Sequence, residues 1–358
     1  MTARSRSRSR DGQRRLQESR CSDFTDQHAP LSDLFEQPST VEGWAKYALS
    51  EAQIAQFNRD GYLTGVRILS NEQVEVLCAE LEALYDRNHP RADLWYQFDC
   101  ILPTDNPRDK LFNSLGAWRM SAGFHDICWS PAFRMAAFQL LGSQYRLLHD
   151  QLFCKPAKDG GVVSWHQDYA YWTWTKPLAH LTCWVGLDDV STESGGLCYV
   201  PGSHTWGLLP TTGLAADMEW VKQVLDPSQV EQLQNCKAPA ELPKGYASFH
   251  HPLTMHGSYG NTSSNVRRGT AIHVMRDGVV SNIGKRDMGN FPAPPSGTVM
   301  QGPCYPMLIA NDAELGLMSK AAGKACNPAL PLDLAEYDAM MLQALRQRLQ
   351  VERQRSTS

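Results

Sequence analysis

Apolar residues recur at three- and four-residue intervals in several segments of the chain, which is the spacing of one face of an α-helix. Ser50 with Gln53 and Ser70 with Gln73 each form a capping-box pattern in front of such a segment. The dipeptide Asp60-Gly61 supplies a stop signal for the first helix. These patterns predict helices beginning after Ser50 and Ser70, a helix at about 131–141 that ends at Gly142, a helical insertion at 215–233 and a closing helix at 333–351.

The pattern changes between Tyr145 and about Met275, where short apolar runs alternate with Gly, Pro, Asn and Asp. Runs of three to five apolar or β-branched residues between turn signals are typical of strands in an antiparallel sheet. We therefore expect a mainly β fold with flanking helices, organised as a barrel or jelly roll. The predicted strands are 62–66, 146–148, 181–185, 197–200, 247–249 and 270–274.

The ends of the chain differ in character from its middle. Residues 1–30 alternate Arg and Ser with almost nothing apolar to bury, which predicts a flexible tail, and order is expected to begin near residue 41. The predicted organisation is a basic tail at 1–40, a single barrel domain at 41–330 and a C-terminal helix and tail at 331–358.

Charge and cysteine usage limit the possible partners and location. The chain carries a formal charge of −4, but its two ends are basic, which leaves −12 on residues 21–340. An acidic body argues against nucleic acid as a partner, since phosphate binding needs clustered Lys and Arg. No run of about 20 apolar residues predicts a membrane span. Ten cysteines without a CxxC pair predict reduced thiols and a cytoplasmic location.

The first candidate for chemistry is the segment Ser164-Trp165-His166-Gln167-Asp168. In an extended chain, side chains two apart point the same way, so His166 and Asp168 are expected to project together while Gln167 points away. One further histidine would complete a two-His, one-carboxylate group, which leaves positions open on a bound iron. The pair alone is a weak signal, because His and Asp two residues apart also occur without a metal.

A second segment supplies the missing partners. His256 follows a predicted strand and precedes a turn rich in Gly, Asn and Ser, and Arg267 comes eleven residues later. If the flanking strands form a hairpin, Arg267 returns beside His256, where its guanidinium can bind a carboxylate in bidentate fashion. Ser258 can donate to the same carboxylate.

Several neighbouring residues leave alternatives open. His250 and His251 are competing third ligands, and Arg268 is a competing carboxylate-binding residue. His204 is expected to be structural, in the turn Pro201-Gly202-Ser203-His204, and Lys155 to be a solvated strand end rather than part of the pocket mouth. His273 can face the site or be an ordinary core residue. The aromatic residues following the His-x-Asp pair are expected to divide between the core and the pocket.

Together, these motifs resemble the phytanoyl-CoA dioxygenase-like family of Fe(II)/2-oxoglutarate-dependent oxygenases. The resemblance rests on HxD at 166–168, on HGSxxNxSxxxRR at 256–268 and on the opening segment 49–69. It also includes Leu187-Asp188-Asp189-Val190 and the following stretch to His204. Over residues 49–276, the resemblance implies a double-stranded β-helix, that is, a cupin-like jelly-roll barrel.

The resemblance also implies roles for individual residues. His166, Asp168 and His256 would be the Fe(II) ligands and the catalytic centre. Arg267 and Ser258 would bind the distal carboxylate of 2-oxoglutarate, and Trp172 and Thr182 would line the pocket of this co-substrate. Because related halogenases lack the carboxylate, the presence of Asp168 implies hydroxylation or desaturation.

The function expected from this resemblance is oxidation of a small organic substrate by Fe(II), 2-oxoglutarate and O2, with release of succinate and CO2. An acyl-CoA 2-hydroxylase of the same family is an alternative, which the −12 body disfavours because CoA phosphates need Lys and Arg. A catalytically silent cupin-like binding protein is another alternative, disfavoured by the intact His-Asp-His set with Arg267. The expected partner is a small molecule, with no nucleic acid or membrane, and the chain is expected to act as a monomer or homodimer.

Overall fold

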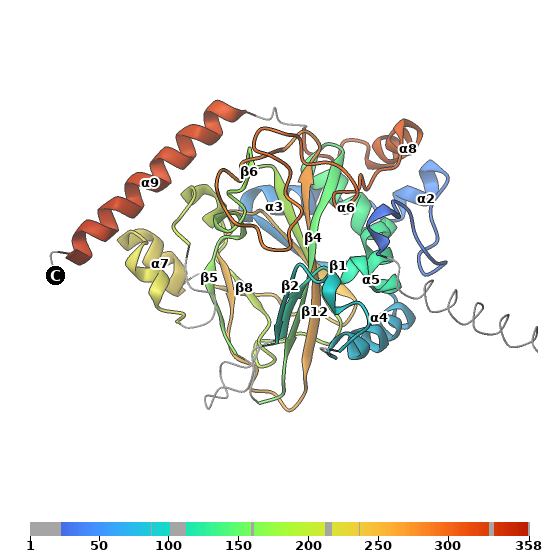
Figure 1. Cartoon of the computed structure of the whole chain (residues 1–358), viewed down its shortest axis with the longest axis horizontal. Helices are drawn as coiled ribbons and strands as arrows, with labels where there is room; N and C mark the ends of the chain where they lie inside the picture. Colours follow the sequence, from blue (N-terminus) through green and yellow to red (C-terminus); the bar gives the residue numbers. More distant parts are fainter. Residues whose placement is uncertain are drawn as a thin grey trace, which may run out of the picture.

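The computed structural model of the chain describes residues 23–86, 88–100, 112–158, 161–211, 217–235, 237–328 and 333–356. Two antiparallel sheets form its centre (Figure 1). The larger sheet has the strand order β1-β10-β7-β12-β4-β3-β2 and the smaller one the order β5-β11-β8-β9. This pair of sheets forms the jelly-roll barrel that the strand pattern predicted, and it is the double-stranded β-helix that the family resemblance implied.

The strands of the larger sheet are β1 (Tyr62–Arg67), β10 (Tyr246–His250), β7 (His180–Gly186), β12 (Arg267–Arg276), β4 (Tyr145–Lys155), β3 (Phe112–Leu115) and β2 (Gln97–Cys100). Those of the smaller sheet are β5 (Val163–His166), β11 (His256–Ser258), β8 (Leu197–Tyr199) and β9 (Ala238–Pro239). A short ribbon pairs β6 (Thr175–Lys176) with β13 (Val280–Ser281).

Helices cover the outer face of the larger sheet. They are α2 (Val41–Ala45), α3 (Glu51–Asp60), α4 (Asn71–Leu84), α5 (Ala122–Asp126), α6 (Pro131–Leu141) and α8 (Asp312–Ala322). The largest apolar cluster joins these helices to outward-facing strand residues such as Cys183, Phe249 and Ile272. The apolar face of the sheet is therefore buried under helices, which leaves its other face free to line the barrel.

The predicted helix signals agree with the structure. Ser50 and Ser70 each cap a helix through a complete capping box with the glutamine three residues later. Helix α3 ends at Gly61, whose φ of +79° is the left-handed conformation that favours glycine. Helix α6 spans Pro131–Leu141 and ends at Gly142.

The chain ends are built differently from the prediction. Residues before 41 already pack on the barrel, since Phe35 is buried in the main core and Asp126 accepts hydrogen bonds from the backbone of Leu31 and Ser32. The predicted insertion helix is shorter and later, as α7 (Pro227–Asn235), and its expected start at Ala215 lies outside the described residues. The closing helix is α9 (Leu334–Ser356), which runs along the edge of the molecule in Figure 1.

The predicted hairpin between the strands of His256 and Arg267 is wrong. Strand β11 pairs with β5 and β8 in the smaller sheet, whereas β12 pairs with β4 and β7 in the larger sheet. The turn between them crosses from one sheet to the other, because in a jelly roll consecutive strands alternate between sheets. His256 and Arg267 therefore reach the same cavity from facing sheets.

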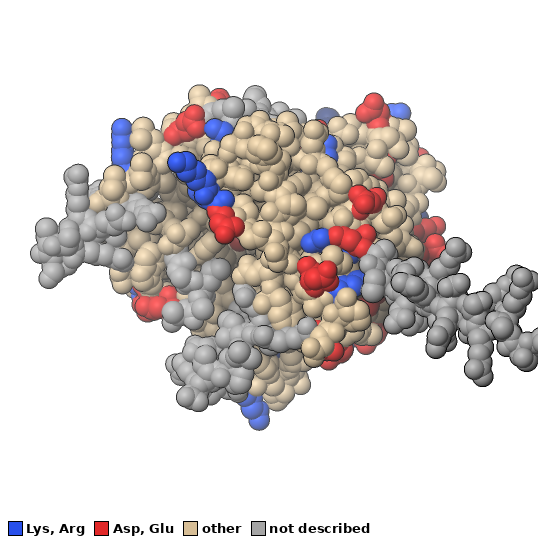
Figure 2. Space-filling view, viewed as in Figure 1, with Lys and Arg blue, Asp and Glu red and all other residues tan. Residues whose placement is uncertain are grey.

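Surface charge and hydropathy give two further observations. On the face drawn in Figure 2, acidic and basic side chains are scattered among uncharged ones and form no large basic patch. Among the described residues, no helix is both long and apolar enough to cross a membrane.

Candidate metal centre and co-substrate pocket

A cavity of about 380 Å³ lies between the two sheets. Its larger wall follows from the alternation of side chains along β4 and β12. Arg267, Ala271 and His273 point inward from β12, and His149 and Gln151 point inward from β4. Because side chains two apart share one face of a strand, this wall is set by every second residue of the two strands.

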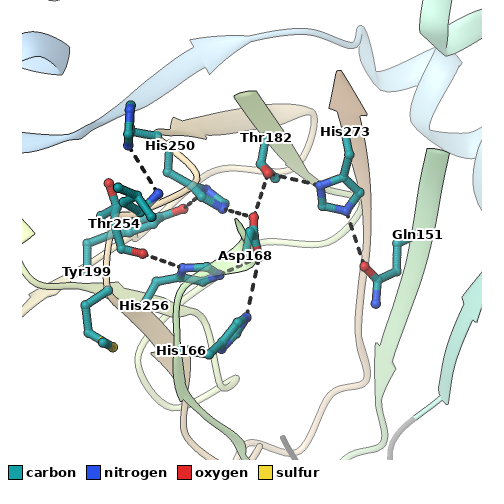
Figure 3. A network of polar contacts seen from close by, with 12 residues as sticks. Gln151, His166, Asp168, Thr182, Tyr199, His250, Thr254, His256 and His273 are labelled. Carbon is teal, nitrogen blue, oxygen red and sulfur yellow. Dashed lines mark hydrogen bonds and ion pairs between the residues drawn. The ribbon is translucent and has the colours of Figure 1, made fainter. Parts of the chain in front are cut away.

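The three predicted metal ligands point toward one another (Figure 3), and all three line this cavity. His166 ends β5 and His256 begins β11, and the two are register partners in the smaller sheet. Both imidazole Nε2 atoms lie 3.5 Å from Oδ1 of Asp168. The ligand atoms of the three residues all lie within 4.8 Å of one another. Among the described residues, no other group of His, Cys, Asp or Glu is found with this geometry.

Asp168 reaches this position from a turn rather than from an extended strand. Strand β5 ends at His166, and Asp168 starts a 3₁₀ turn, Asp168–Ala170. The side chain of Gln167 points away, as predicted, and bonds the backbone of Gly207, Leu209 and Leu253. These bonds anchor the segment on the side opposite to the two ligands.

The backbone fixes the tautomer of both histidines. Nδ1 of His166 lies 2.7 Å from the carbonyl of Ser164, and Nδ1 of His256 lies 2.9 Å from the carbonyl of Thr254. A carbonyl only accepts, so each Nδ1 carries a proton, and in the neutral imidazole the lone pair is then on Nε2. Burial, with His166 and His250 nearby, lowers the pKa of His256 well below its usual value. A neutral imidazole with an unprotonated Nε2 is the form that binds a metal, so the residues present fit an iron ion.

The carboxylate is held by two side chains from the larger sheet. Thr182 donates to Oδ2 of Asp168 at 2.6 Å, and Nε2 of His250 lies 2.9 Å from the same oxygen. Burial alone would raise the pKa of Asp168, but the adjacent His256, His166 and His250 hold that pKa well below its usual range. Asp168 is therefore ionised, with Oδ1 directed at the two Nε2 atoms.

The competing histidines have other positions. Both ring nitrogens of His250 are engaged, one by Asp168 and one by the hydroxyl of Tyr199 at 3.1 Å. His251 accepts from the backbone of Leu253, and His204 packs against the His251 ring, outside the described lining of the cavity. His273 does face the site, with Nδ1 3.0 Å from Thr182 Oγ1.

Arg267 is a buried cation at another part of the cavity wall. It is 2% exposed, its Nη2 donates to the carbonyl of Gly195 at 2.9 Å and its guanidinium lies over the Trp184 ring. Its Nε has no hydrogen-bond partner, and no described carboxylate lies within ion-pair distance. Burial lowers its pKa to about 10, which leaves it protonated at neutral pH. A buried guanidinium with an unused donor fits the carboxylate of a bound 2-oxo dicarboxylic acid.

Arg268 points to the opposite face of β12. Its guanidinium forms two hydrogen bonds with Asp188, at 2.9 and 2.7 Å, outside the cavity. The alternation along the strand thus separates two adjacent arginines, and only Arg267 lines the cavity.

The predicted position of Lys155, at the solvated end of a strand, is wrong. Lys155 is completely buried. Its Nζ donates to Ser258 Oγ at 2.7 Å and to the carbonyls of Ser258 and Tyr259. Lys155 is also the register partner of Arg267. Burial and the neighbouring Arg267 lower its pKa well below the usual value.

The remaining predicted residues also line the cavity. Ser258 and Trp172 are on its wall, and Trp172 packs against His273 with ring centroids 4.8 Å apart. Thr182 bonds the metal-ligand candidate Asp168. Sequence reasoning did not assign Trp184 or Gly195 to the site. Alternation from Thr182, two residues earlier on the same predicted strand, could have indicated Trp184, but nothing local marks Gly195.

The barrel, the convergent His-Asp-His group and the buried arginine define the class of non-haem iron, 2-oxoglutarate-dependent oxygenases. A sequence profile of the phytanoyl-CoA dioxygenase (PhyH) family matches residues 57–269. The chain belongs to this family.

Relatives of known function differ in how much they share with the chain. It is 25% identical over 231 residues to L-proline trans-4-hydroxylase of Streptomyces griseoviridis, a match that covers 59% of this chain and 81% of that enzyme. It is 29% identical over 173 residues to ectoine dioxygenase of Bordetella bronchiseptica. That second match covers 47% of this chain but only 54% of the ectoine enzyme.

Solved structures support the fold. SnoK, described as a non-haem α-ketoglutarate-dependent carbocyclase from nogalamycin biosynthesis, superposes with a TM-score of 0.61 at 23% identity. The superposition covers 76% of this chain and 99% of SnoK. EctD from S. alaskensis, solved with 2-oxoglutarate and 5-hydroxyectoine, gives a TM-score of 0.55 at 20% identity over 77% of this chain and 95% of EctD.

Proposed function

We propose that this protein is a dioxygenase that hydroxylates or desaturates a free small organic molecule, using Fe(II), 2-oxoglutarate and O2. His166, Asp168 and His256 are the proposed metal ligands, and Arg267 with Ser258 the proposed binding site for the distal carboxylate of 2-oxoglutarate. When bound, these groups supply an oxidation in which 2-oxoglutarate loses CO2 to become succinate and a substrate C–H bond is oxidised.

The observation that carries the proposal is the orientation of the two histidines. Both Nδ1 atoms are committed to backbone carbonyls, and both Nε2 atoms are directed at the same carboxylate oxygen. A histidine that binds a metal through one ring nitrogen almost always donates the N–H of the other to a carbonyl, carboxylate or water, and both histidines have this arrangement.

The proposed roles of the other residues follow from their contacts. Thr182 and His250 hold the second oxygen of Asp168, so the first remains directed at the metal position. Lys155 donates to Ser258 Oγ, which leaves the hydroxyl proton of Ser258 available for an incoming carboxylate. The ring of Trp184 beneath Arg267 restrains the guanidinium that would bind the same group.

A free small molecule is the substrate class that we propose, as for the relatives whose names refer to proline and ectoine. An acyl-CoA substrate is the competing proposal, since the chain is also 22% identical over 233 residues to the peroxisomal phytanoyl-CoA dioxygenase of Bos taurus. A silent binding protein is disfavoured, because it would not need a buried arginine without a carboxylate partner.

The experiment is to supply the full-length protein with Fe(II), 2-oxoglutarate and O2, together with pools of small metabolites and separate pools of acyl-CoA esters. We expect succinate to form faster with a small-molecule pool, and His166→Ala to abolish succinate formation. Faster turnover only with acyl-CoA would favour the competing substrate class. Absence of succinate in every pool would contradict the proposed function.

A further inference from the structure

The part of the cavity beyond the metal and Arg267 indicates what the substrate is like. We propose that the substrate is an uncharged molecule with a flat ring, whose carbonyl or hydroxyl groups face an amide wall on β2, β3 and β4. The inference rests on the proposed function, since that function assigns His166, Asp168 and His256 to the metal and Arg267 to 2-oxoglutarate.

One side of this region is aromatic. Trp172 and Trp174 follow the metal-ligand turn, and Phe291 comes from the long segment after β13; all three line the cavity. The ring of Phe291 lies 5.9 Å from Trp174 and 5.6 Å from His149, and Trp172 lies 5.7 Å from His149. Tyr171 and Met288 extend the same wall. Closely spaced ring faces favour a flat apolar ligand, because aromatic groups stack on one another.

The cavity lining also carries three side-chain amides. Gln97 on β2, Asn113 on β3 and Gln151 on β4 all line the cavity. The register places Leu115 opposite both Gln97 and Gln151, so these two glutamines lie in one row across the sheet. Gln151 donates to Asn113 at 2.6 Å. Amides offer both donors and acceptors without charge, which suits neutral oxygen-bearing groups.

A chain of polar contacts links the amide wall to the metal-ligand candidate. Gln151 Oε1 lies 3.2 Å from His273, His273 lies 3.0 Å from Thr182, and Thr182 donates to Asp168 (Figure 3). A substrate held by these amides is therefore positioned by the same network that holds the metal carboxylate.

Charge is scarce in the described cavity lining. In this lining, Asp168 is the only carboxylate and Arg267 is the only guanidinium or ammonium group. The proposed function assigns Asp168 to the metal and Arg267 to 2-oxoglutarate. Burial lowers the pKa of His149 to about 4 and that of His273 well below its usual value, so both are neutral at physiological pH. A charged substrate would lose its hydration without gaining a counter-ion, which disfavours free amino acids and carboxylic acids.

The test uses three probes that share one ring system and differ in charge: naphthalene-2-carboxamide, naphthalene-2-carboxylate and naphthalen-2-ylmethylammonium. Each is titrated calorimetrically, without O2, into full-length protein saturated with Fe(II) and 2-oxoglutarate. We expect the neutral carboxamide to bind at least tenfold more tightly than either charged probe. Binding of a charged probe within tenfold of the carboxamide, or no binding of any probe, would overturn the proposal.

Introducing a negative charge into the amide wall tests whether the probes bind against it. Asn113→Asp should improve binding of the ammonium probe at least tenfold, because it supplies the missing counter-ion. Asn265→Asp makes the same chemical change in an exposed turn and should leave all three affinities unchanged. An unaltered ammonium affinity in Asn113→Asp would contradict the assignment. The visible absorption band of the Fe(II)–2-oxoglutarate complex is recorded first, so that failure of the proposed function is seen separately.

Discussion

Arg267 and Arg268 are adjacent in sequence but have opposite surroundings. Arg267 is buried in the cavity with an unpaired Nε, and Arg268 is half-buried on the outer face, in a bidentate pair with Asp188. Hydrogen bonds to a charged group contribute about 1.5–3 kcal/mol, so the two residues should contribute very differently to co-substrate binding.

We expect Arg267→Ala to weaken 2-oxoglutarate binding by about 10- to 100-fold while metal binding stays within about twofold of the native protein. Arg268→Ala is the matched control and should leave 2-oxoglutarate affinity unchanged. Anaerobic titration of the Fe(II)-loaded variants with 2-oxoglutarate measures both. If Arg268→Ala weakens binding and Arg267→Ala does not, the assignment of the carboxylate site is wrong.

At the residue level, the sequence predicted most of the candidate site, because the His-x-Asp pair and His256 with Ser258 and Arg267 are local motifs. Their roles as ligands stay a prediction. Lys155 was misjudged because lysine is rarely buried, and its acceptors lie about a hundred residues away. Gly195 was missed for the same reason, since its carbonyl meets Arg267 only through the fold.

At the level of helices and strands, local sequence signals predicted the helix starts correctly, but the pairing of the strands could not be predicted. The capping boxes at Ser50 and Ser70 require only residues within one turn, so the helix starts could be predicted. The prediction for β4 found only its apolar start, 146–148, because its later inward residues, His149 and Gln151, are polar where they line the cavity. Which sheet receives β11 and β12 depends on long-range pairing that no local pattern encodes.

The turn between α3 and β1 gives a prediction at this scale. Gly61 has a φ of +79°, and a Cβ there would lie 2.4 Å from His204 Nδ1 and 2.6 Å from Thr254 Oγ1. We expect Gly61→Ala to lower the free energy of unfolding by about 2–5 kcal/mol, from the left-handed backbone and overpacking together.

Gly65 provides the control, because its φ is +84° and a Cβ there would meet nothing within 4 Å. Gly65→Ala should therefore show only the backbone cost of about 1–2 kcal/mol. Urea denaturation of both variants separates the two effects. Equal losses would show that the contacts of Gly61 with His204 and Thr254 are unimportant.

The whole molecule combines an apolar outer sheet face under helices with a polar, histidine-rich inner face. The sequence predicted this fold class, and the family assignment confirms it. Burying several neutral histidines has a cost in acid, because the unfolded chain takes up protons that the folded state cannot. His180 is one of them: it is buried, and burial lowers its pKa from 6.5 to about 3.

The sign of the pH effect follows from this shift. The folded pKa lies below the unfolded one, so stability is unaffected above pH 6.5 and falls as the pH drops towards 3. Between pH 7.5 and 5, His180 alone should reduce the free energy of unfolding by about 2 kcal/mol. We expect the free energy of unfolding of His180→Gln to fall by about 2 kcal/mol less than that of the native protein between pH 7.5 and 5. Denaturation at both pH values measures this difference. An identical pH dependence would contradict the prediction.

In the whole molecule, we propose that His166, Asp168 and His256 bind Fe(II) in a cavity where Arg267 binds 2-oxoglutarate. The most direct measurement is the visible absorption spectrum of the full-length protein mixed anaerobically with Fe(II) and 2-oxoglutarate. We expect a metal-to-ligand charge-transfer band that requires both components, saturates at about one Fe(II) per chain and disappears in the His166→Ala, His256→Ala double variant. Absence of the band at saturating concentrations, or its persistence in the double variant, would contradict this proposal.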